Sequence, residues 1–226
     1  DGYPHLQKAL QEMIRNRLTA VQRMEVAEDR IGNRDILESV LTADVEKIRM
    51  TMDELDRSAF EKSAFCITKA KRIYILGVRS SSALASFMGF YFTLLFGNVY
   101  VLDTNSGSEI LEQILHIGEG DVFIGISFPR YSQRTLAAMK YSKAHGANVI
   151  ALTDSSLSPL ANYADHTLIA KSDMASFVDS LVAPLSVINA IIVQVSMDRQ
   201  EEVEKTFNQL ESIWNEYNVY ETMDES

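Results

Sequence analysis

The sequence lacks several features that would each point to a particular class of protein. It has one cysteine, Cys66, among 226 residues, so no internal disulfide can form and a reducing, cytoplasmic setting is expected. No apolar run reaches the roughly 18 residues that a membrane span needs. The longest, within 182–195, is interrupted by Pro184 and by polar residues. The first residues are polar and amphipathic, so we expect no signal peptide and no membrane partner.

Positive charge is also scarce. Lysine and arginine number 21 against 31 aspartates and glutamates, which gives a formal net charge of −10. Because general binding of nucleic acid depends on lysine and arginine contacts to phosphates, this chain is not expected to bind DNA through its surface. A DNA-binding segment outside the chain stays compatible with this charge. The sequence begins at Asp1 without a methionine, so we expect it to be a piece of a longer or processed protein.

The common cofactor motifs are missing as well. Gly77 is not followed by the second and third glycines of a Gly-x-Gly-x-x-Gly loop, so no dinucleotide cofactor is expected. No lysine of the Walker type follows a glycine-rich loop, which disfavours nucleotide hydrolysis. The four histidines, His5, His116, His145 and His166, show no metal-ligand spacing. We therefore predict neither a cofactor nor a metal.

What the sequence does contain is a change of periodicity near residue 70. Before it, apolar residues recur at helical spacing within 4–28, 36–48 and 59–67. After it, short β-branched runs alternate with helical stretches. Strands are expected at 72–77, 98–103, 121–127, 148–153 and 166–169, with helices at 82–96, 108–116, 132–145, 158–163, 174–197 and 199–217. This alternation predicts an α/β fold with a parallel sheet covered on both faces.

Two of the loops that follow these strands are rich in hydroxyl groups. Residues 77–82 read Gly-Val-Arg-Ser-Ser-Ser and residues 127–132 read Ser-Phe-Pro-Arg-Tyr-Ser. Each loop leads into a helix N-terminus, where unpaired N–H groups and a partial positive charge favour an anion. Ligands of open parallel sheets bind at the carboxyl ends of strands. The two loops together therefore predict a site for a phosphate-sized anion.

Each candidate residue also has an ordinary structural explanation. A serine at the start of a helix is often only an N-cap, and Arg79 and Arg130 are equally compatible with solvated surface charges. Asp103 ends a strand, where it can hydrogen-bond a sugar hydroxyl or cap the next loop. We predict no catalytic residue. The predicted ligand-binding residues are Arg79, Ser80, Ser81, Ser82, Asp103, Ser127, Arg130 and Ser132.

Three stretches resemble the sugar isomerase (SIS) domain. They are Ile75-Leu76-Gly77 with the serines that follow, Ile126-Ser127 with 129–132, and Ile-Ala-Leu-Thr-Asp-Ser at 150–155 followed by Ser-Pro-Leu-Ala at 158–161 and Ala-Asp at 164–165. The last stretch is the most specific, and the resemblance covers about 38–197. The Phe-Pro-Arg-Tyr-Ser loop is similar to that of RpiR-type bacterial transcriptional regulators.

The resemblance implies a flavodoxin-like, three-layer α/β sandwich with a five-stranded parallel sheet, forming a homodimer or homotetramer. It implies that hydroxyls matching Ser80, Ser127 and Ser132 hold the phosphate of a phosphosugar, with Ser81 and Ser82 as neighbours. The segment 171–173 would lie at the edge of the site.

The N-terminal segment agrees with the regulator family. Residues 1–7 resemble the end of its helix-turn-helix domain, and residues 14–19 resemble its connecting helix. On this basis residues 1–35 are the end of a truncated DNA-binding domain with the connecting helix. Residues 36–226 are then the SIS domain with flanking helices, and operator DNA is bound only through the missing part.

Three functions remain open at this point. The first is a phosphosugar sensor of a transcriptional regulator, and the second is a phosphosugar isomerase. Isomerisation needs a positioned base, usually Glu or His, and the strand-end loops offer none, so the sensor is favoured. Glu109 and His116 would reach the site only if the second strand-end loop folded over it, although a partner subunit can also donate a base. The third is a purely structural oligomerisation module.

Overall fold

The computed structural model describes residues 35–172 and 178–219, with a few isolated positions before residue 35. The N-terminal stretches that resemble a helix-turn-helix domain and its connecting helix lie almost wholly outside the described residues, as does Asp173. Among the described helices, none combines the length and the apolar character that crossing a membrane requires.

A five-stranded sheet forms the centre of the molecule, and all its neighbouring strands pair in parallel. The strand order is β2-β1-β3-β4-β5, and the order reverses between β1 and β3, as in doubly wound folds of the flavodoxin type. The predicted parallel sheet is therefore confirmed. The strands are β1 Ile73–Gly77, β2 Val99–Val101, β3 Val122–Ile126, β4 Asn148–Thr153 and β5 His166–Ile169.

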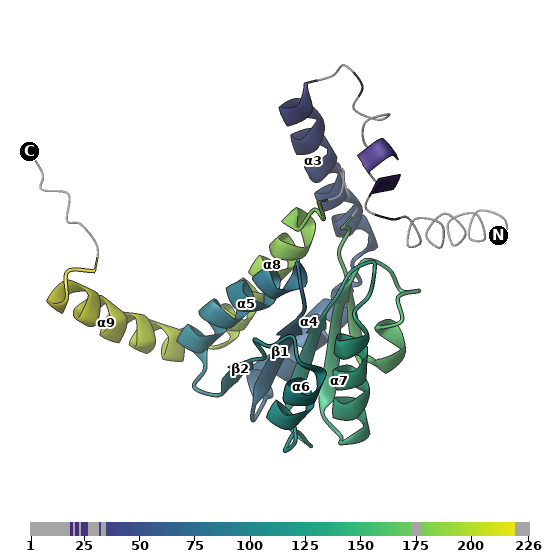
Figure 1. Cartoon of the computed structure of the whole chain (residues 1–226). Helices are drawn as coiled ribbons and strands as arrows, with labels where there is room; N and C mark the ends of the chain where they lie inside the picture. Colours follow the sequence, from purple (N-terminus) through teal and green to yellow (C-terminus); the bar gives the residue numbers. More distant parts are fainter. Residues whose placement is uncertain are drawn as a thin grey trace, which may run out of the picture.

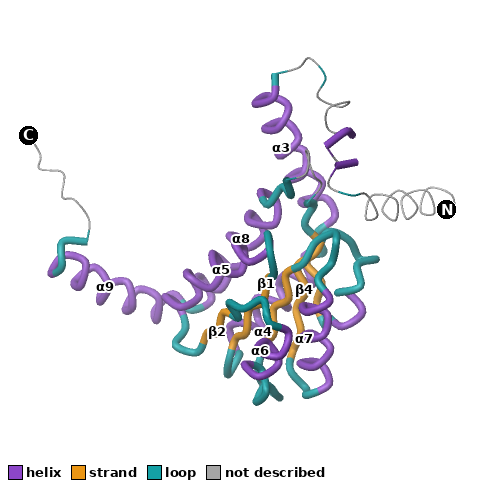
Figure 2. The backbone as a smooth tube through the Cα atoms, viewed as in Figure 1, coloured by secondary structure: helices purple, strands orange, loops and turns teal. Residues whose placement is uncertain are grey.

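Helices cover both faces of this sheet, which gives the predicted three layers (Figures 1 and 2). One apolar core joins the sheet to α4, α5 and α8, and the other joins it to α6 and α7. Side chains of β1 alternate between them, with Ile73 and Ile75 in the first core and Tyr74 and Leu76 in the second. The helices are α3 Ile36–Glu54, α4 Arg57–Lys69, α5 Ser81–Leu95, α6 Gly107–Gln113, α7 Gln133–Ala144, α8 Val182–Asp198 and α9 Gln200–Glu216.

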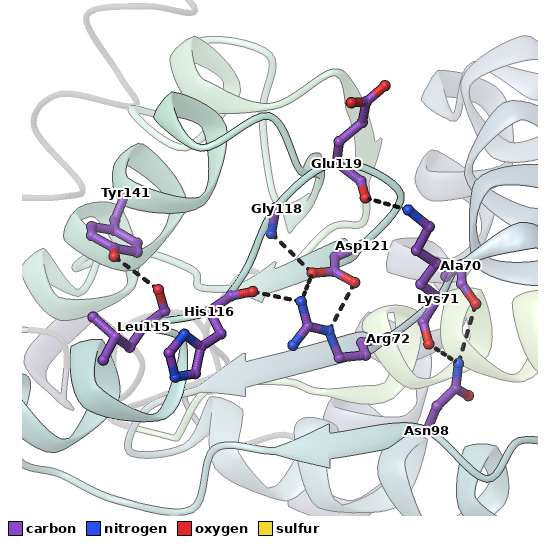
Figure 3. Close-up of polar contacts among 10 residues, drawn as sticks. All are labelled: Ala70, Lys71, Arg72, Asn98, Leu115, His116, Gly118, Glu119, Asp121 and Tyr141. Carbon is purple, nitrogen blue, oxygen red and sulfur yellow. Dashed lines mark hydrogen bonds and ion pairs between the residues drawn. The ribbon is translucent and has the colours of Figure 1, made fainter.

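At the amino end of the sheet, charged side chains form a hydrogen-bonded cluster (Figure 3). Arg72, just before β1, donates from Nε and Nη2 to the two carboxylate oxygens of Asp121, at 3.0 and 2.6 Å. Asp121 is 1% exposed and also accepts from the Gly118 N–H. Arg72 further donates to the carbonyl oxygen of His116. These bonds hold the starts of β1 and β3 together, although 49 residues separate the two partners.

Two helices predicted after β4 differ from their predicted form. The helix predicted over 174–197 begins only at Val182, so residues 178–181 form a loop. The short helix predicted over 158–163 is a 3₁₀ turn, Ala161–Tyr163. The last helix, α9, projects away from the sheet (Figures 1 and 2) and contains no buried residue.

Candidate functional site

The first hydroxyl-rich loop makes a tight turn from β1 into α5. A Cβ atom at Gly77 would lie 2.2 Å from the carbonyl oxygen of Ser81, so only glycine allows the helix to start this close to the strand. Arg79 has φ of 61°, a left-handed conformation that is uncommon outside glycine and that is concentrated at functional sites. The turn therefore brings the N-terminus of α5 directly over the carboxyl end of β1.

The second loop starts level with the first. In the parallel pair of β1 and β3, Gly77 is the register partner of Ile126, so Val78 and Ser127 leave the sheet side by side. This is also the position at which the strand order reverses. Crevices at such reversal points are the usual ligand sites of open α/β sheets. The fold thus brings together the two loops that the sequence singled out.

The three serines of the first loop have different surroundings. Ser80 is exposed and makes no capping bond with α5; its hydroxyl donates to Oδ2 of Asp179 at 2.7 Å. Ser81 is buried, at 5% exposure. Ser82 donates its hydroxyl proton to the carbonyl oxygen of Arg79 at 2.6 Å, which stabilises the turn. Ser80 is therefore the hydroxyl of this loop that is best placed to meet a ligand.

Both predicted serines of the second loop use their oxygen atoms as acceptors. Ser132 is the N-cap of α7 and accepts from the Thr135 N–H at 3.3 Å, while Ser127 accepts from the Ser132 N–H at 3.0 Å. A hydroxyl that accepts one bond still has its proton to donate. Capping and ligand binding are therefore compatible at these two serines rather than alternatives.

The remaining predicted residues frame these loops. Arg79 and Arg130 are exposed, one in each loop. Tyr131, next to Arg130, donates its hydroxyl to Asp154 at 2.9 Å, and Asp154 is 4% exposed after β4. Asp103 is exposed after β2, the edge strand beside β1. Within the described residues, no hydrogen bond or ion pair joins the Asp103 side chain to either loop.

The three histidines of the described residues lie at the other end of the sheet. His116 precedes β3, and its carbonyl oxygen accepts from Arg72 in the amino-end cluster (Figure 3). His145 is the C-cap of α7, which leads into β4, and His166 is the first residue of β5. Since the strands are parallel, these positions are remote from the two loops. His116 is thereby removed as a candidate base, while Glu109 accepts a hydrogen bond from Thr104 beyond the edge strand.

Three acidic residues at the carboxyl end of the sheet were not among the predicted site residues. Asp179 contacts Ser80, Asp44 of α3 accepts from the Ser180 hydroxyl at 2.6 Å, and Glu54 at the end of α3 pairs with buried Lys171 at 2.6 Å. Lys171 also donates to the carbonyl oxygen of Asp154 at 3.3 Å. One signal was present: Asp179-Ser180 directly precedes an apolar run, which is a common helix start.

A sequence profile of the SIS domain matches residues 66–194, more than half of the chain. The chain belongs to the SIS domain family. This confirms the resemblance inferred from the sequence motifs, and the match includes both hydroxyl-rich loops.

Similar proteins include transcriptional regulators. An uncharacterised HTH-type transcriptional regulator of Haemophilus influenzae is 30% identical over 135 residues, which are 59% of this chain and 46% of the relative. The chain thus spans about half the length of that relative. The sugar isomerase domain of an RpiR transcription factor from Sphaerobacter thermophilus superposes with a TM-score of 0.74 and 29% identity, covering 78% of this chain and 98% of that one.

More distant SIS structures share the fold alone. The Vibrio vulnificus NanR protein, solved in complex with ManNAc-6P, superposes with a TM-score of 0.71 at 16% identity, covering 86% of this chain and 74% of NanR. Isomerases, among them a phosphoheptose isomerase from Neisseria gonorrhoeae, also have this fold. The fold by itself therefore does not separate sensors from enzymes.

Proposed function

We propose that this SIS domain is the phosphosugar-sensing part of a transcriptional regulator. The observation that carries the proposal is the pairing of the two hydroxyl-rich loops, which leave adjacent strands side by side, each ahead of a helix N-terminus. Ser80, Ser127 and Ser132 would donate to the phosphate, with Ser81 and Ser82 beside them. Arg79 and Arg130 would neutralise its charge, and Asp103 would contact a sugar hydroxyl.

The relatives support a regulator. The curated relatives are HTH-type regulators. The superposition with the RpiR structure includes nearly the whole of that RpiR chain. NanR, a member with the same fold, was solved with a phosphorylated sugar. In this proposal residues 1–35 complete the DNA-binding domain and its connecting helix, residues 36–226 sense the effector, and the regulator is a cytoplasmic homodimer or homotetramer.

A sensing role without catalysis is supported by the positions of the titratable groups. An isomerase must hold a base within hydrogen-bonding reach of the substrate carbon. The histidines of the described residues lie at the amino end of the sheet, and three carboxylates at the carboxyl end have other partners: Asp154 with Tyr131, Asp179 with Ser80, and Glu54 with Lys171. A sensor needs only a difference in affinity between two states of the protein.

The test of sensing combines binding with DNA recognition. The chain is screened by thermal shift against a panel that includes ManNAc-6P, aldose phosphates, ketose phosphates and the matching unphosphorylated sugars, because a ligand of the native state raises its melting temperature. We expect a shift only with phosphorylated sugars. The same compound should then change the gel shift of operator DNA by the full-length regulator. No response to any phosphosugar in either assay would contradict the proposal.

The two other functions, an isomerase and a structural module, are tested with the same chain and the same compounds. Turnover of an aldose or ketose phosphate by the chain, detected by NMR, would contradict the sensing function and support an isomerase. A stable oligomer that binds no phosphorylated compound would leave only a structural module. Each outcome is distinct because sensing alone predicts saturable binding without turnover.

A further inference from the structure

A carboxylate engages the hydroxyl that is best placed to bind phosphate. The Ser80 hydroxyl donates to Oδ2 of Asp179 at 2.7 Å, and Asp179 lies in the loop just before α8, far from Ser80 in sequence. An O–H bonded to an ionised oxygen is stronger than a neutral hydrogen bond. A carboxylate oxygen offers Ser80 the same kind of acceptor as a phosphate oxygen. Asp179 therefore takes the hydrogen bond that the Ser80 hydroxyl would offer to a phosphate.

Phosphate and Asp179 cannot share this position. The Ser80 hydroxyl has one proton, so it cannot donate to a phosphate oxygen and to the Asp179 carboxylate at once. A phosphate bound at Ser80 beside Asp179 would also place two anions close together, where they repel one another. Asp179 is half-buried rather than enclosed, so it is able to move toward solvent. A ligand phosphate has to displace this carboxylate from Ser80.

The loop that contains Asp179 is also tied to α3. The next residue, Ser180, donates its hydroxyl to Oδ1 of Asp44 at 2.6 Å, and its carbonyl oxygen accepts from the Ser172 hydroxyl at 3.0 Å. Asp44 in turn pairs with Lys47, whose side chain is 7% exposed. Asp179 and Ser180 thus link the first hydroxyl-rich loop to α3, the helix that follows the N-terminal segment.

We propose that Asp179 is an internal competitor for the phosphate site, and that its displacement by ligand is relayed to α3 through the Ser180–Asp44 hydrogen bond. This rests on the proposed function, because it assumes that the phosphate binds at Ser80. Ligand binding and the position of α3 are coupled through one short loop. The effector would thereby bias the helix that leads to the DNA-binding part of the regulator.

The competition is tested with inorganic phosphate and isothermal titration at fixed ionic strength. We expect Asp179→Asn to bind phosphate about tenfold or more tightly than the wild type, since the substitution removes one like charge beside the site. Asp198→Asn is the matched control: it removes the same charge from the far end of α8, and it should bind as the wild type does. Asp179→Ala checks that the gain does not depend on the new amide.

The relay is tested by hydrogen exchange of α3. Saturation of the wild type with phosphate should speed exchange of the amides around Asp44, and Asp179→Asn should show part of this increase without phosphate. Ser180→Ala should bind phosphate but lose the response of α3 to it. Identical exchange of α3 in the free and saturated wild type would overturn the relay.

Failure of this inference is distinguishable from failure of the proposed function. If the wild type binds phosphate and Ser80→Ala weakens binding, but Asp179→Asn binds equally or more weakly, the phosphate site at the first hydroxyl-rich loop is retained and the role of Asp179 as competitor is wrong. If no variant binds phosphate and no phosphosugar shifts the melting temperature, both proposals fail.

Discussion

The two ends of the parallel sheet use polar side chains in opposite ways. At the amino end, Asp121 is buried and accepts from Arg72 and from the Gly118 N–H, so each group is satisfied by another part of the same chain (Figure 3). At the carboxyl end, Ser127 and Ser132 accept bonds and keep their protons, and Arg130 is exposed. The first arrangement stabilises the fold, whereas the second leaves hydrogen-bond donors for a ligand.

This difference explains why both ends contain charged residues but only one is a candidate site. A paired, buried charge resists removal because its partner would be left without compensation. A hydroxyl at a helix N-terminus contributes little to stability beyond its cap. Substitutions at the amino end should therefore alter stability alone, and substitutions at the carboxyl end should alter binding. The predictions below test that separation in order of expected size.

The largest effect is expected for Asp121→Ala at the amino end. The substitution removes the hydrogen bonds from Arg72 and leaves the Gly118 N–H without its acceptor, so we expect the free energy of unfolding to fall by about 3 kcal/mol. Urea unfolding followed by circular dichroism measures it. Phosphosugar affinity of the folded protein should stay unchanged.

A nearby residue provides the control for that experiment. Glu119 is exposed, and it is its carbonyl oxygen, not its side chain, that accepts the bond from Lys71 (Figure 3). Glu119→Ala should thus change stability by less than about 0.5 kcal/mol. A loss below about 1 kcal/mol in Asp121→Ala would show that the amino-end cluster does not have the stabilising role assigned to it.

The second prediction concerns Ser80→Ala combined with Ser127→Ala at the carboxyl end. Loss of two hydroxyl donors to a charged phosphate should weaken phosphosugar binding by at least about tenfold, with a destabilisation of about 1 kcal/mol because the Ser132 N–H loses its acceptor. Titration calorimetry with a compound found in the screen measures the affinity. Ser212→Ala in α9 is the matched control, and equal affinity in all three proteins would remove the central claim about the loops.

A smaller effect is expected for Arg130→Gln. Because Arg130 is exposed, its attraction for phosphate is screened by water and salt, so we expect binding to weaken only about threefold to tenfold. The difference from the wild type should shrink as sodium chloride is raised. Arg134→Gln, an exposed arginine on the adjoining helix α7, should bind normally. A loss that is independent of salt would mean that Arg130 supports the loop rather than the anion.

Much of the sheet could be predicted because its strands are short, buried runs that are rich in β-branched residues. β4 and β5 begin and end at the predicted positions, and β1 differs by one residue. The two hydroxyl-rich loops could be identified from their hydroxyl groups and from their place after predicted strands. Their closeness followed from the parallel register, which pairs Gly77 with Ile126.

The contacts that depend on tertiary packing could not be predicted. Periodicity alone extended α8 back to residue 174, so the loop that places Asp179 against Ser80 was missed. The pairing of Arg72 with Asp121 joins residues far apart in sequence, and each residue alone resembles an ordinary surface charge. Local patterns specify which residues end a strand, but they do not specify which distant side chain meets them.

The smallest predicted effect is a pH dependence at the amino end. Burial lowers the pKa of His166, and it outweighs the opposing attraction of Asp165. The pKa of Asp165 is lowered: burial raises it, but the hydrogen bonds from Lys143 and from the Val149 N–H, together with nearby positive charge, lower it by more, so Asp165 stays ionised in mildly acidic solution. The folded state therefore favours neutral His166, and the stability from this histidine is present above its unfolded pKa of about 6.5.

That stability should be lost as the pH falls from about 6.5 through the lower pKa of folded His166. Urea unfolding at pH 7.5 and at pH 5.5 should therefore show a smaller decrease in His166→Gln than in the wild type. His116→Gln, at an exposed position near the same end of the sheet, serves as the control and should decrease as the wild type does. Phosphosugar affinity measured on each variant at pH 7.5 should equal that of the wild type, since both histidines lie at the end of the sheet opposite the loops. A shared change in affinity would mean that the two ends are coupled rather than separate.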